Sequence, residues 1–453
     1  MVNLDVLIVG AGTAGEYATG YAIGNGRSVG MVERGPVGGA CIFNACIPTK
    51  ALVHAARTYT KMRHADFFGL PVLAEAAQYA KVKSFKDSIV AGIATGRDER
   101  WIKQGVQVFK GSARFVSPHG IVVGDQEITA SKIIISTGSS PAGPPIPGLK
   151  ESGFITNVEA LQMERLPERL VIIGGGAVGV EFAHIFATFG ASVHIIEMLD
   201  RLLATEDADI SAAATEALRR KGVSVLTSAK VSGVTTASSS KIVNLVRADG
   251  TPEDVECDEI LVAAGRRPNI EDLHLPAAGV EATKRGITVD GSLQTSVPHI
   301  WAAGDVTGTH LFTYVAGEQG KTAALNATTD VRRELEYQVL PRSIFCEPEG
   351  ASVGLTESQA REQGYEVRSG TFKYADLTRA IVSGETEGFI KVVADGTSGL
   401  ILGGHIIGSE ASTLIHEIAV AMAARATAAD VGNLLHSYPT YSEGVRYACQ
   451  AVR

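Results

Sequence analysis

The pattern of apolar and polar positions along the chain predicts an α/β protein. An apolar run from Leu4 to Val9 leads into a glycine-rich turn, and a helical pattern then continues to about Gly24. A second apolar strand is expected from Ser28 to Glu33. A strand, a helix and a strand in this order form a βαβ unit, in which the strands are parallel.

The same pattern recurs in the middle of the chain. Leu170–Ile173 is expected to be a strand, a glycine-rich turn follows it, and Ser192–Ile196 is expected to be the next strand. Two helical regions are predicted between the units, from Lys50 to Arg63 and from Tyr79 to Gln104. The sequence therefore predicts two βαβ units rather than one.

Both turns carry the spacing Gly-x-Gly-x-x-Gly. The first contains Gly10, Gly12 and Gly15, and the second contains Gly174, Gly176 and Gly179. Glycines in such a turn allow a pyrophosphate to approach the backbone, and the free N–H groups of the following helix favour its negative charge. The alternative is a glycine-rich turn without a ligand. Because a strand, the glycines, a helix, a second strand and an acidic residue follow one another in the expected order in each unit, we expect two dinucleotide sites.

An acidic residue ends the second strand of each unit, and its position is typical of ribose recognition. Glu33 follows the first unit and Glu197 the second, and each carboxylate can accept hydrogen bonds from ribose hydroxyls. A carboxylate at Glu197 repels a 2′-phosphate, which favours NAD(H) over NADP(H). Arg201, four residues later, acts against that preference.

Further features indicate how the units are connected. Apolar strands that end in glycine, Ile133–Gly138 and Ile260–Gly265, mark the crossings between them, and Pro141–Pro147 is expected to be a stiff linker. After about Glu334 the pattern changes to alternating strands and two helices. We predict a first dinucleotide-binding domain of residues 1–148 and 265–332, a second of residues 149–264, and a C-terminal α+β domain of residues 333–453.

Composition and charge restrict the function further. A chain of 453 residues is long enough for about three domains, and its net charge of -8 includes no basic block for binding nucleic acid. We find no apolar run of about 18 residues and no signal peptide, so we expect no membrane span and a cytoplasmic location. The odd number of cysteines, five, does not suggest a secreted disulfide framework.

Two of the cysteines, Cys41 and Cys46, form a Cys-x4-Cys pair shortly after Glu33. The spacing differs from the Cys-x2-Cys of zinc sites and no second ligand pair appears, so we expect no resident metal. On an ideal helix their Cα atoms would be roughly 8–9 Å apart, whereas a disulfide needs less than about 7 Å. A disulfide therefore requires a distorted segment, and Pro48 favours it by lacking the N–H that would bond to Asn44. Two inert thiols are the alternative.

Together these motifs resemble the pyridine nucleotide–disulfide oxidoreductases, which include lipoamide dehydrogenase, glutathione reductase and mercuric reductase. The resemblance covers essentially the whole chain. Besides the two glycine fingerprints, it is carried by Gly38–Lys50, Ser136–Gly138, Ala264–Asn269, Ala303–Asp305 and Glu349–Glu357.

The resemblance implies FAD in the first domain and NAD(H) in the second. Motif residues implied to bind the cofactors are Gly39, Thr137, Gly138, Gly265, Gly304 and Asp305, with Asp305 on the ribityl chain of the flavin. Lys50 and Glu181 would pair near the flavin N5. Cys46 would be the thiol that faces the flavin, and Cys41 would exchange with the substrate. The C-terminal domain would form a homodimer whose active sites use residues of both subunits.

The C-terminal motif departs from lipoamide dehydrogenases, which carry His-x-His-Pro-Thr-x-Ser-Glu. Here Tyr438 stands at the position of the catalytic base, while His436 matches the first histidine and Glu443 the orienting acid. Histidine has an unperturbed pKa of about 6.5 and tyrosine of about 10, so tyrosine is a poor base at neutral pH. We expect slow dithiol oxidation at neutral pH, unless His436 substitutes as the base or the substrate thiol is already ionised.

Three branches of the family stay open. A lipoamide-dehydrogenase-like enzyme with an altered base, acting on a small disulfide or a lipoyl-carrying protein, is favoured by His405–Gly408 and Ser442-Glu443. A mercuric-reductase-like enzyme is favoured by Tyr438 and Phe312–Ala316, but only Cys449 lies near the C-terminus. A transhydrogenase or quinone reductase is disfavoured because both active-site cysteines are present. A non-enzymatic redox sensor or scaffold is the alternative from another class.

Overall fold

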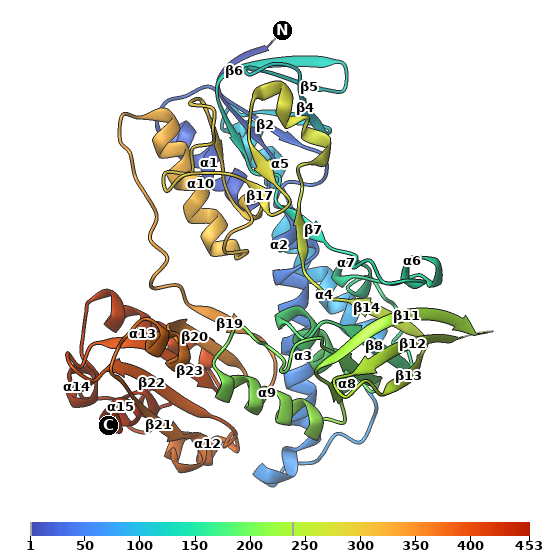
Figure 1. The fold of residues 1–453 in the computed structure, drawn as a ribbon, viewed down its shortest axis with the longest axis vertical. Coiled ribbons are helices and arrows are strands. Elements are labelled where there is room, and N and C mark those ends of the chain that lie inside the picture. The colour runs from blue at the N-terminus through green and yellow to red at the C-terminus, as the bar shows by residue number, and fades with distance from the viewer. Residues whose placement is uncertain (1, 238–239) are drawn as a thin grey trace. The chain divides into compact units, whose positions relative to one another are not determined.

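The computed structural model describes residues 2–237 and 240–453. The chain divides into two compact units (Figure 1). The first consists of Met1–Thr49, Ser84–Ala142 and Gly265–Glu336, and the second of Lys50–Lys83, Gly143–Ala264 and Tyr337–Arg453. The second unit thus contains both the predicted second dinucleotide domain and the predicted C-terminal domain, and the three-domain boundaries stay a prediction.

A seven-stranded sheet forms the centre of the first unit, with the order β3-β2-β1-β6-β5-β4 and β18 paired to β6. Its central strands are parallel, and β1 is buried on both faces, which explains its nearly continuous apolar sequence. The strands are β1 (Val2–Val9), β2 (Val29–Glu33), β3 (Gln107–Lys110), β4 (Ala113–Phe115), β5 (Gly120–Val123), β6 (Gln126–Ile135) and β18 (Ile300–Ala302).

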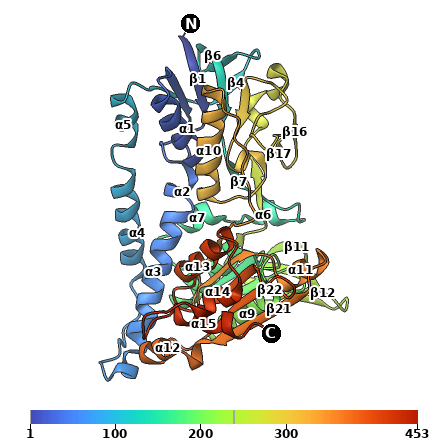
Figure 2. The ribbon, with the colours of Figure 1, turned by 90° about the vertical axis from the view of Figure 1, so that its left-hand side faces the viewer.

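Strand β18 shows how the first unit is assembled from distant segments. Ile300 pairs with Ile133 in parallel register, so the chain returns to the first sheet after the second βαβ unit. Helices α1 (Thr13–Gly24) and α10 (Thr313–Thr328) lie side by side (Figure 2). A methyl carbon built on Gly320 would lie 2.1 Å from the carbonyl oxygen of Ala14, so this glycine permits their close approach.

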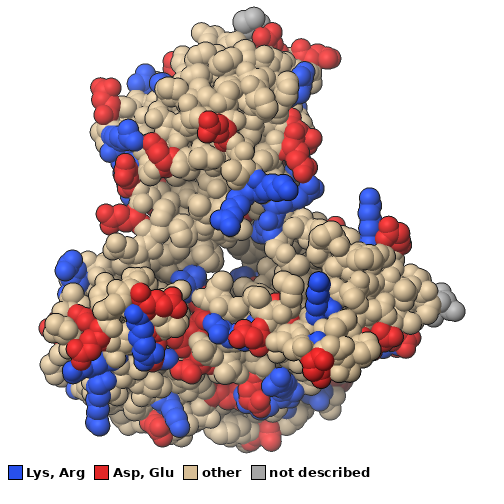
Figure 3. All heavy atoms as spheres, in the orientation of Figure 1, with Lys and Arg blue, Asp and Glu red and all other residues tan. Residues whose placement is uncertain are grey.

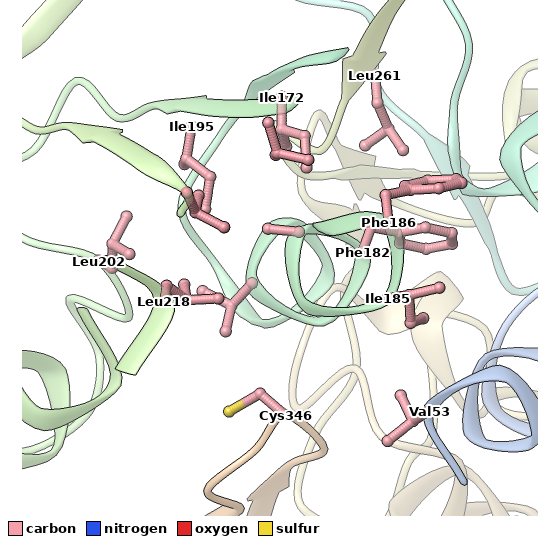
Figure 4. Close-up of a cluster of buried hydrophobic side chains, with 14 of the residues drawn as sticks. Val53, Ile172, Phe182, Ile185, Phe186, Ile195, Leu202, Leu218, Leu261 and Cys346 are labelled. Atoms are coloured by element: carbon pink, nitrogen blue, oxygen red, sulfur yellow. The ribbon is translucent and has the colours of Figure 1, made fainter. Parts of the chain in front are cut away.

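The second unit contains the other βαβ pattern. Its parallel sheet has the order β10-β9-β8-β14, with β8 (Arg169–Ile173), β9 (Ser192–Ile196), β10 (Ser224–Leu226) and β14 (Glu259–Val262). Helix α8 (Ala177–Thr188) follows β8 and is buried among apolar side chains. Figure 4 shows Phe182, Ile185 and Phe186 of α8 in this core with Ile172 of β8. An antiparallel sheet, β11-β12-β13, is formed by Ala229–Ala237, Ser240–Arg247 and Pro252–Cys257.

The C-terminal part of the second unit contains a five-stranded antiparallel sheet of order β19-β20-β23-β22-β21. The strands are β19 (Arg342–Ile344), β20 (Gly350–Gly354), β21 (Val367–Lys373), β22 (Phe389–Asp395) and β23 (Ile401–Ile407). The helices are α11 (Glu357–Glu362), α12 (Thr378–Ser383), α13 (Ala411–Ala423), α14 (Ala428–Asn433) and α15 (Glu443–Gln450). The expectation of two helices was wrong, because α11, α12 and α14 are too short to show a helical period.

Three other expectations also need correction. The helical region from Tyr79 to Gln104 is interrupted, because α4 (Tyr79–Ala94) ends before Gly96, whose φ of 72° is left-handed, and α5 (Arg97–Lys103) begins after it. The linker begins as a strand, since β7 (Ser139–Pro141) pairs with β15 (Arg266–Pro268). The long helix α3 (Cys46–Arg63) begins four residues before the predicted start at Lys50.

The remaining elements are short, apart from α9. They are α2 (Gly39–Phe43), α6 (Leu149–Ser152), α7 (Asn157–Ala160), α9 (Ala208–Arg220), β16 (Ala282–Thr283) and β17 (Gly286–Ile287), with single 3-10 turns at Ala65–Phe68, Glu271–Leu273, Leu275–Ala278, Asp305–Thr307 and Tyr374–Asp376. In the described parts of the chain, no helix combines the length and the apolar character that a membrane crossing needs. Acidic and basic side chains alternate over the face shown in Figure 3.

Candidate active site

The first glycine fingerprint forms the turn between β1 and α1. Gly10 has a φ of 103°, and a methyl carbon there would lie 2.5 Å from the carbonyl oxygen of Ser136. A methyl carbon on Gly15 would lie 1.9 Å from the carbonyl oxygen of Gly10. The protein itself therefore requires glycine at both positions, the first for conformation and space and the second for space.

Gly12 is different, because nothing in the protein requires glycine there. Its backbone is extended, with φ -74° and ψ -170°, and the nearest atom to a methyl carbon would be the Cα of Gly39, at 3.9 Å. The space beside Gly12 adjoins the N-terminus of the twelve-residue helix α1. Free space for a ligand at a helix N-terminus fits the pyrophosphate of a dinucleotide.

Glu33 is held in place by the backbone of the same turn. Its Oε2 accepts a hydrogen bond from the N–H of Ala11 at 2.8 Å, and its Oε1 accepts one from the N–H of Gly35 at 2.7 Å. The carboxylate lines a pocket in the first unit together with Gly10, Arg34, Gly111, Thr137, Ser140, Arg267 and Asn269. A fixed acceptor in a polar pocket suits an adenosine ribose.

The second fingerprint repeats this geometry in the other unit. Gly174 has a φ of 113°, and a methyl carbon on Gly179 would lie 2.0 Å from the carbonyl oxygen of Gly174. Gly176 is extended, and a methyl carbon there would meet no atom within 4 Å. The Oε2 of Glu197 accepts a hydrogen bond from the N–H of Gly175 at 2.6 Å, and Oε1 accepts one from Leu199 at 2.8 Å. This site therefore also fits a dinucleotide.

Arg201, which was expected to oppose a preference for NAD(H), is engaged locally. Its guanidinium donates a hydrogen bond to the carbonyl oxygen of Ala204 at 3.1 Å, and its Nε is buried. Glu197 is therefore the acidic group beside the second fingerprint, while the Arg201 guanidinium is held by its own loop.

Polar side chains from separate segments of the first unit gather around Asp305. Its Oδ2 accepts a hydrogen bond from the hydroxyl of Ser139 at 2.6 Å and lies 3.6 Å from the Nε of Arg266. Gly304 has a φ of 80° and donates its N–H to the Oε1 of Gln319 at 2.7 Å. Sequence reasoning assigned no role to Ser139 or Arg266, although both adjoin the Thr137-Gly138 and Gly265 motifs.

Thr137 and Gly138 lie just before β7, and Thr137 is hydrogen-bonded to Asn269, which lies just after β15. Thr137 donates its hydroxyl to the carbonyl oxygen of Asn269 at 2.8 Å, and the amide of Asn269 donates back to the carbonyl oxygen of Thr137 at 2.8 Å. Gly138 and Gly265 have φ of 69° and 111°, and a methyl carbon at either would meet no atom within 4 Å. Glycine is needed at both for the left-handed backbone.

The cysteine segment is distorted, as a Cys41–Cys46 disulfide requires. Helix α2, which contains Cys41, ends at Phe43, and Asn44 leaves the helical region with φ -135° and ψ 6°. Helix α3 begins at Cys46, and the N–H of Thr49 bonds to the carbonyl oxygen of Ala45 at 3.1 Å. Both cysteines are partly exposed.

This segment also lies against the first fingerprint. Gly39 has a φ of 63°, and a methyl carbon there would lie 2.6 Å from the Cα of Gly12. The N–H of Gly38 bonds to the carbonyl oxygen of Ala11 at 2.8 Å. The Sγ of Cys46 lies 3.6 Å from the Oγ1 of Thr313 at the start of α10. The cysteines are therefore next to the first dinucleotide site, within one unit.

Lys50 and Glu181 form a two-pronged ion pair in the second unit. The Nζ of Lys50 lies 3.1 Å from Oε1 and 2.9 Å from Oε2 of Glu181. Glu181 is buried, and its Oε1 also accepts a hydrogen bond from the N–H of Phe345 at 3.0 Å. The Nζ of Lys50 lies 4.5 Å from the centre of the Phe345 ring. A buried charge of this kind is stable because it is paired and hydrogen-bonded.

Tyr438 and Glu443 are close in sequence but have different surroundings. Tyr438 is 71% exposed, and its hydroxyl lies 3.5 Å from the Oγ1 of Thr378. Glu443 is buried, accepting hydrogen bonds from the N–H of Thr440 at 3.1 Å and the hydroxyl of Tyr447 at 3.2 Å. The acid holds the backbone of the Tyr438 loop rather than the Tyr438 hydroxyl.

His436 is engaged elsewhere. Its Nε2 lies 2.7 Å from the Oε1 of Glu417 on α13, its Nδ1 lies 3.2 Å from the carbonyl oxygen of Leu434, and only 8% of its side chain is exposed. Both ring nitrogens therefore have partners, while the Tyr438 ring is open to solvent. This arrangement does not favour His436 as a substitute base.

The other cysteines are buried thiols. Burial raises the pKa of Cys257 to about 11, and burial raises the pKa values of Cys346 and Cys449 to about 12. All three are therefore protonated near neutral pH and poor nucleophiles. Among residues 2–237 and 240–453, no cluster of three or more His, Cys, Asp or Glu side chains could hold a metal ion.

Two dinucleotide sites and an adjacent cysteine pair define a flavoprotein disulfide oxidoreductase. Residues 4–320 match the family described as pyridine nucleotide-disulphide oxidoreductase, and residues 340–449 match its dimerisation domain. The chain belongs to this family, whose members use FAD and NAD(H). The match to the dimerisation domain supports a homodimer.

Similar proteins fall into several branches of the family. A dihydrolipoyl dehydrogenase of Bacillus subtilis is 35% identical over 99% of this chain and 97% of its own. A mercuric reductase of Staphylococcus aureus is 35% identical over 98% of this chain and 82% of its own. The structure of a Cu(II) complex of the HOCl-induced flavoprotein disulfide reductase RclA from Escherichia coli is 29% identical, with a TM-score of 0.89 and complete coverage of both chains.

Proposed function

We propose that the protein is an NAD(H)-dependent disulfide oxidoreductase, similar to dihydrolipoyl dehydrogenase, that acts through a Cys41–Cys46 disulfide. The observation that carries the proposal is the interrupted helix between the two cysteines, next to the first dinucleotide cradle. The helical conformation is broken at Asn44, between the end of α2 and the start of α3 at Cys46. An unbroken helix would hold the two cysteines too far apart for a disulfide. Inert thiols would not need this distortion.

The proposed reaction passes the two electrons of a hydride from NADH to a disulfide substrate. Bound FAD supplies the two-electron relay between the nicotinamide and the cysteines. NADH donates a hydride, the Cys41–Cys46 bond breaks, and the products are NAD⁺, one thiolate and one thiol. With Cys46 as the thiolate, the Cys41 thiol loses its proton and attacks a disulfide substrate by thiol–disulfide exchange, and the first substrate sulfur leaves and takes up that proton. The Cys46 thiolate then re-forms the Cys41–Cys46 bond, and the second substrate sulfur leaves as a thiolate. With a dithiol substrate every step runs in reverse.

Lys50 and Glu181 are proposed to place a fixed charge near the flavin. Glu181 is buried and receives both the Lys50 ammonium and the N–H of Phe345, so the ammonium cannot rotate freely. A positioned cation stabilises negative charge that develops during electron transfer, at no cost in reorganisation. Asp305 is proposed to bind the ribityl chain, supported by its place beside Ser139 and Gly304.

A preference for NAD(H) is part of the proposal. The carboxylate of Glu197 is fixed by two backbone N–H groups, and a 2′-phosphate would bring negative charge toward it. The Arg201 guanidinium donates to Ala204. A shared active site, with Tyr438 of one subunit beside the cysteines of the other, is proposed from the dimerisation domain and the exposure of Tyr438.

Proton transfer is the unusual part of the proposal, because Tyr438 stands at the position of the histidine base. The first experiment is dihydrolipoamide-dependent NAD⁺ reduction by the purified enzyme from roughly pH 6 to 10, since a base acts only above its own pKa. We expect low activity near neutral pH that rises in alkali. Tyr438→His should increase the neutral rate by roughly tenfold or more, because general acid–base catalysis typically contributes at least that much.

Tyr438→Phe is the matched control, because it keeps the ring and removes only the hydroxyl. High activity of the parent at neutral pH, unchanged in Tyr438→His, would show that another group handles the proton. Loss of NADH-dependent disulfide reduction in Cys41→Ser and in Cys46→Ser is required in either case. A variant that keeps full activity would contradict the proposal.

A soft-metal reductase is the second candidate. Tyr438 stands where mercuric reductases also carry tyrosine, and cysteine thiolates bind soft metals. Support comes from the relative named mercuric reductase and from the RclA structure named as a Cu(II) complex. NADH oxidation that depends on Hg(II) or Cu(II), faster than with any disulfide tested, would favour this candidate. A transhydrogenase or quinone reductase is less favoured, because both cysteines are present.

A further inference from the structure

We infer that Thr313 is a positioning residue that stabilises the Cys46 thiolate and so favours the reduced form of the cysteine pair. The inference rests on the proposed function, because it assumes that Cys46 cycles between disulfide and thiolate. It begins from the contact between the Cys46 Sγ and the Thr313 Oγ1, which are 3.6 Å apart and 267 positions apart in sequence.

The place of Thr313 in α10 leaves its hydroxyl available for Cys46. Thr313 is the first residue of this sixteen-residue helix, and the capping residue before it, Phe312, makes no side-chain cap. Threonine is branched at Cβ, which restricts rotation about χ1. The side chain therefore holds its hydroxyl near the sulfur at a small entropic cost.

The surroundings favour a negative charge on this sulfur. Cys46 is the first residue of α3, and Thr313 is the first residue of α10. The N-terminus of a helix carries partial positive charge, which stabilises an adjacent anion. The Thr313 hydroxyl adds a neutral donor to the same place, so thiolate stabilisation does not depend only on a charged group.

The hydroxyl distinguishes the two redox states. A thiolate is an anionic acceptor, and hydrogen bonds to charged groups are stronger than those between neutral groups. A disulfide sulfur is neutral and accepts weakly. Donation from Thr313 therefore stabilises the reduced pair more than the oxidised pair. Tyr438 stands at the motif position of the histidine, so that position supplies no imidazolium, which makes this donor more important.

The experiment compares Thr313→Val, which removes the hydroxyl at nearly constant shape, with Thr313→Ser, which keeps it. Both are made in a Cys41→Ser holoenzyme, so that Cys46 is the only partly exposed cysteine among the described residues. The rate of Cys46 alkylation by iodoacetamide is followed against pH by mass spectrometry. Thr329→Val, which removes a hydroxyl at the other end of α10, is the matched control.

Thr313→Val should raise the alkylation midpoint by about one pH unit, which lowers the thiolate fraction near neutral pH roughly tenfold. Thr313→Ser and Thr329→Val should keep the midpoint of the Cys41→Ser parent. An unchanged midpoint in Thr313→Val would overturn the inference. An equal shift in Thr313→Ser would also overturn it, because packing rather than the hydroxyl would then be responsible.

A second measurement separates this inference from the proposed function. The enzyme with both cysteines intact is incubated with NADH, and the newly exposed thiols are counted. Two new thiols support the disulfide, and the Thr313 variants then test the stabilisation by itself. If no thiol appears, the proposed function fails whatever the alkylation midpoints are.

Discussion

The two glycine fingerprints have nearly the same backbone but different neighbours. Gly10 and Gly174 share a strongly positive φ, and Glu33 and Glu197 each accept two backbone N–H groups. Around the first fingerprint, however, Gly39 is packed against Gly12, and the cysteine segment bonds to the turn. Around Gly176 a methyl carbon would meet no atom within 4 Å.

This difference shows how one local motif can serve two purposes. The first turn is covered by the segment that carries the cysteines, which suits a cofactor that stays bound beside them. The second turn is open, which suits a nucleotide that binds and leaves in each cycle. The motif forms the same turn in both units, and the neighbouring segment decides how enclosed that turn is.

The largest expected effect comes from Gly12→Ala. The backbone tolerates alanine, so the fold should survive, but the methyl group enters an enclosed cradle and should weaken FAD binding by roughly a hundredfold. The measurement is FAD content and FAD affinity of the purified protein. Gly24→Ala, at the open end of α1, is the control. Full FAD occupancy at low FAD concentration would contradict an enclosed first site.

Gly176→Ala should have a smaller effect, on the other cofactor. The site is open, so the nucleotide can shift away from the methyl group, and KM for NADH should rise by roughly tenfold while FAD stays bound. Steady-state kinetics together with the flavin spectrum test this. If FAD were lost, or if KM changed as much as FAD affinity does in Gly12→Ala, the two sites would not differ as described.

Glu197→Gln should change the choice of nucleotide. The amide keeps the size of the side chain but removes the charge that repels a 2′-phosphate. The ratio of kcat/KM for NADH over NADPH should fall by roughly tenfold. Glu33→Gln makes the same change in the first unit and should affect FAD affinity without altering that ratio. A ratio that moves equally in both variants would contradict the assignment of the two sites.

The smallest effect concerns pH and stability. His184 of α8 stands where α1 has Gly20, and burial holds its pKa well below the ordinary value of 6.5. The folded state keeps His184 neutral while the unfolded state binds a proton, so stability is lost as the pH falls below about 6.5, by at most about 1.4 kcal/mol per pH unit. Denaturant unfolding of the parent and His184→Leu near pH 5.5 and 7.5 should show a smaller acid loss in the variant.

Much of the architecture could be predicted from local patterns. The parallel strands of both βαβ units, helix α1 and the start of β9 lie where the apolar pattern places them, because buried strands and glycine turns have strong local signatures. The short helices α11, α12 and α14 could not be predicted, since one or two turns give no period. The break at Gly96 was also missed, although glycine is a common interruption of helices.

The candidate site was also predictable from the sequence only in part. The glycines, the acids Glu33 and Glu197 and the need for a distorted segment between Cys41 and Cys46 all follow from residues close together in sequence. The partners of the side chains do not, because they come from distant elements. Thr313 of α10 contacts Cys46, and Ser139 of β7 donates a hydrogen bond to Asp305. Phe345, in the C-terminal part of the chain, donates its N–H to Glu181.

The sequence by itself determined the family, the two glycine-rich turns and the spacing of the cysteine pair, because each depends on backbone conformations that a few neighbouring residues impose. Only the tertiary structure decided which side chains are available. In the folded chain, His436 is paired with Glu417, and Glu443 accepts hydrogen bonds from Thr440 and Tyr447. Tyr438 is exposed. The physical reason is that hydrogen-bond partners and burial depend on which distant elements pack together, and a linear pattern does not encode that directly.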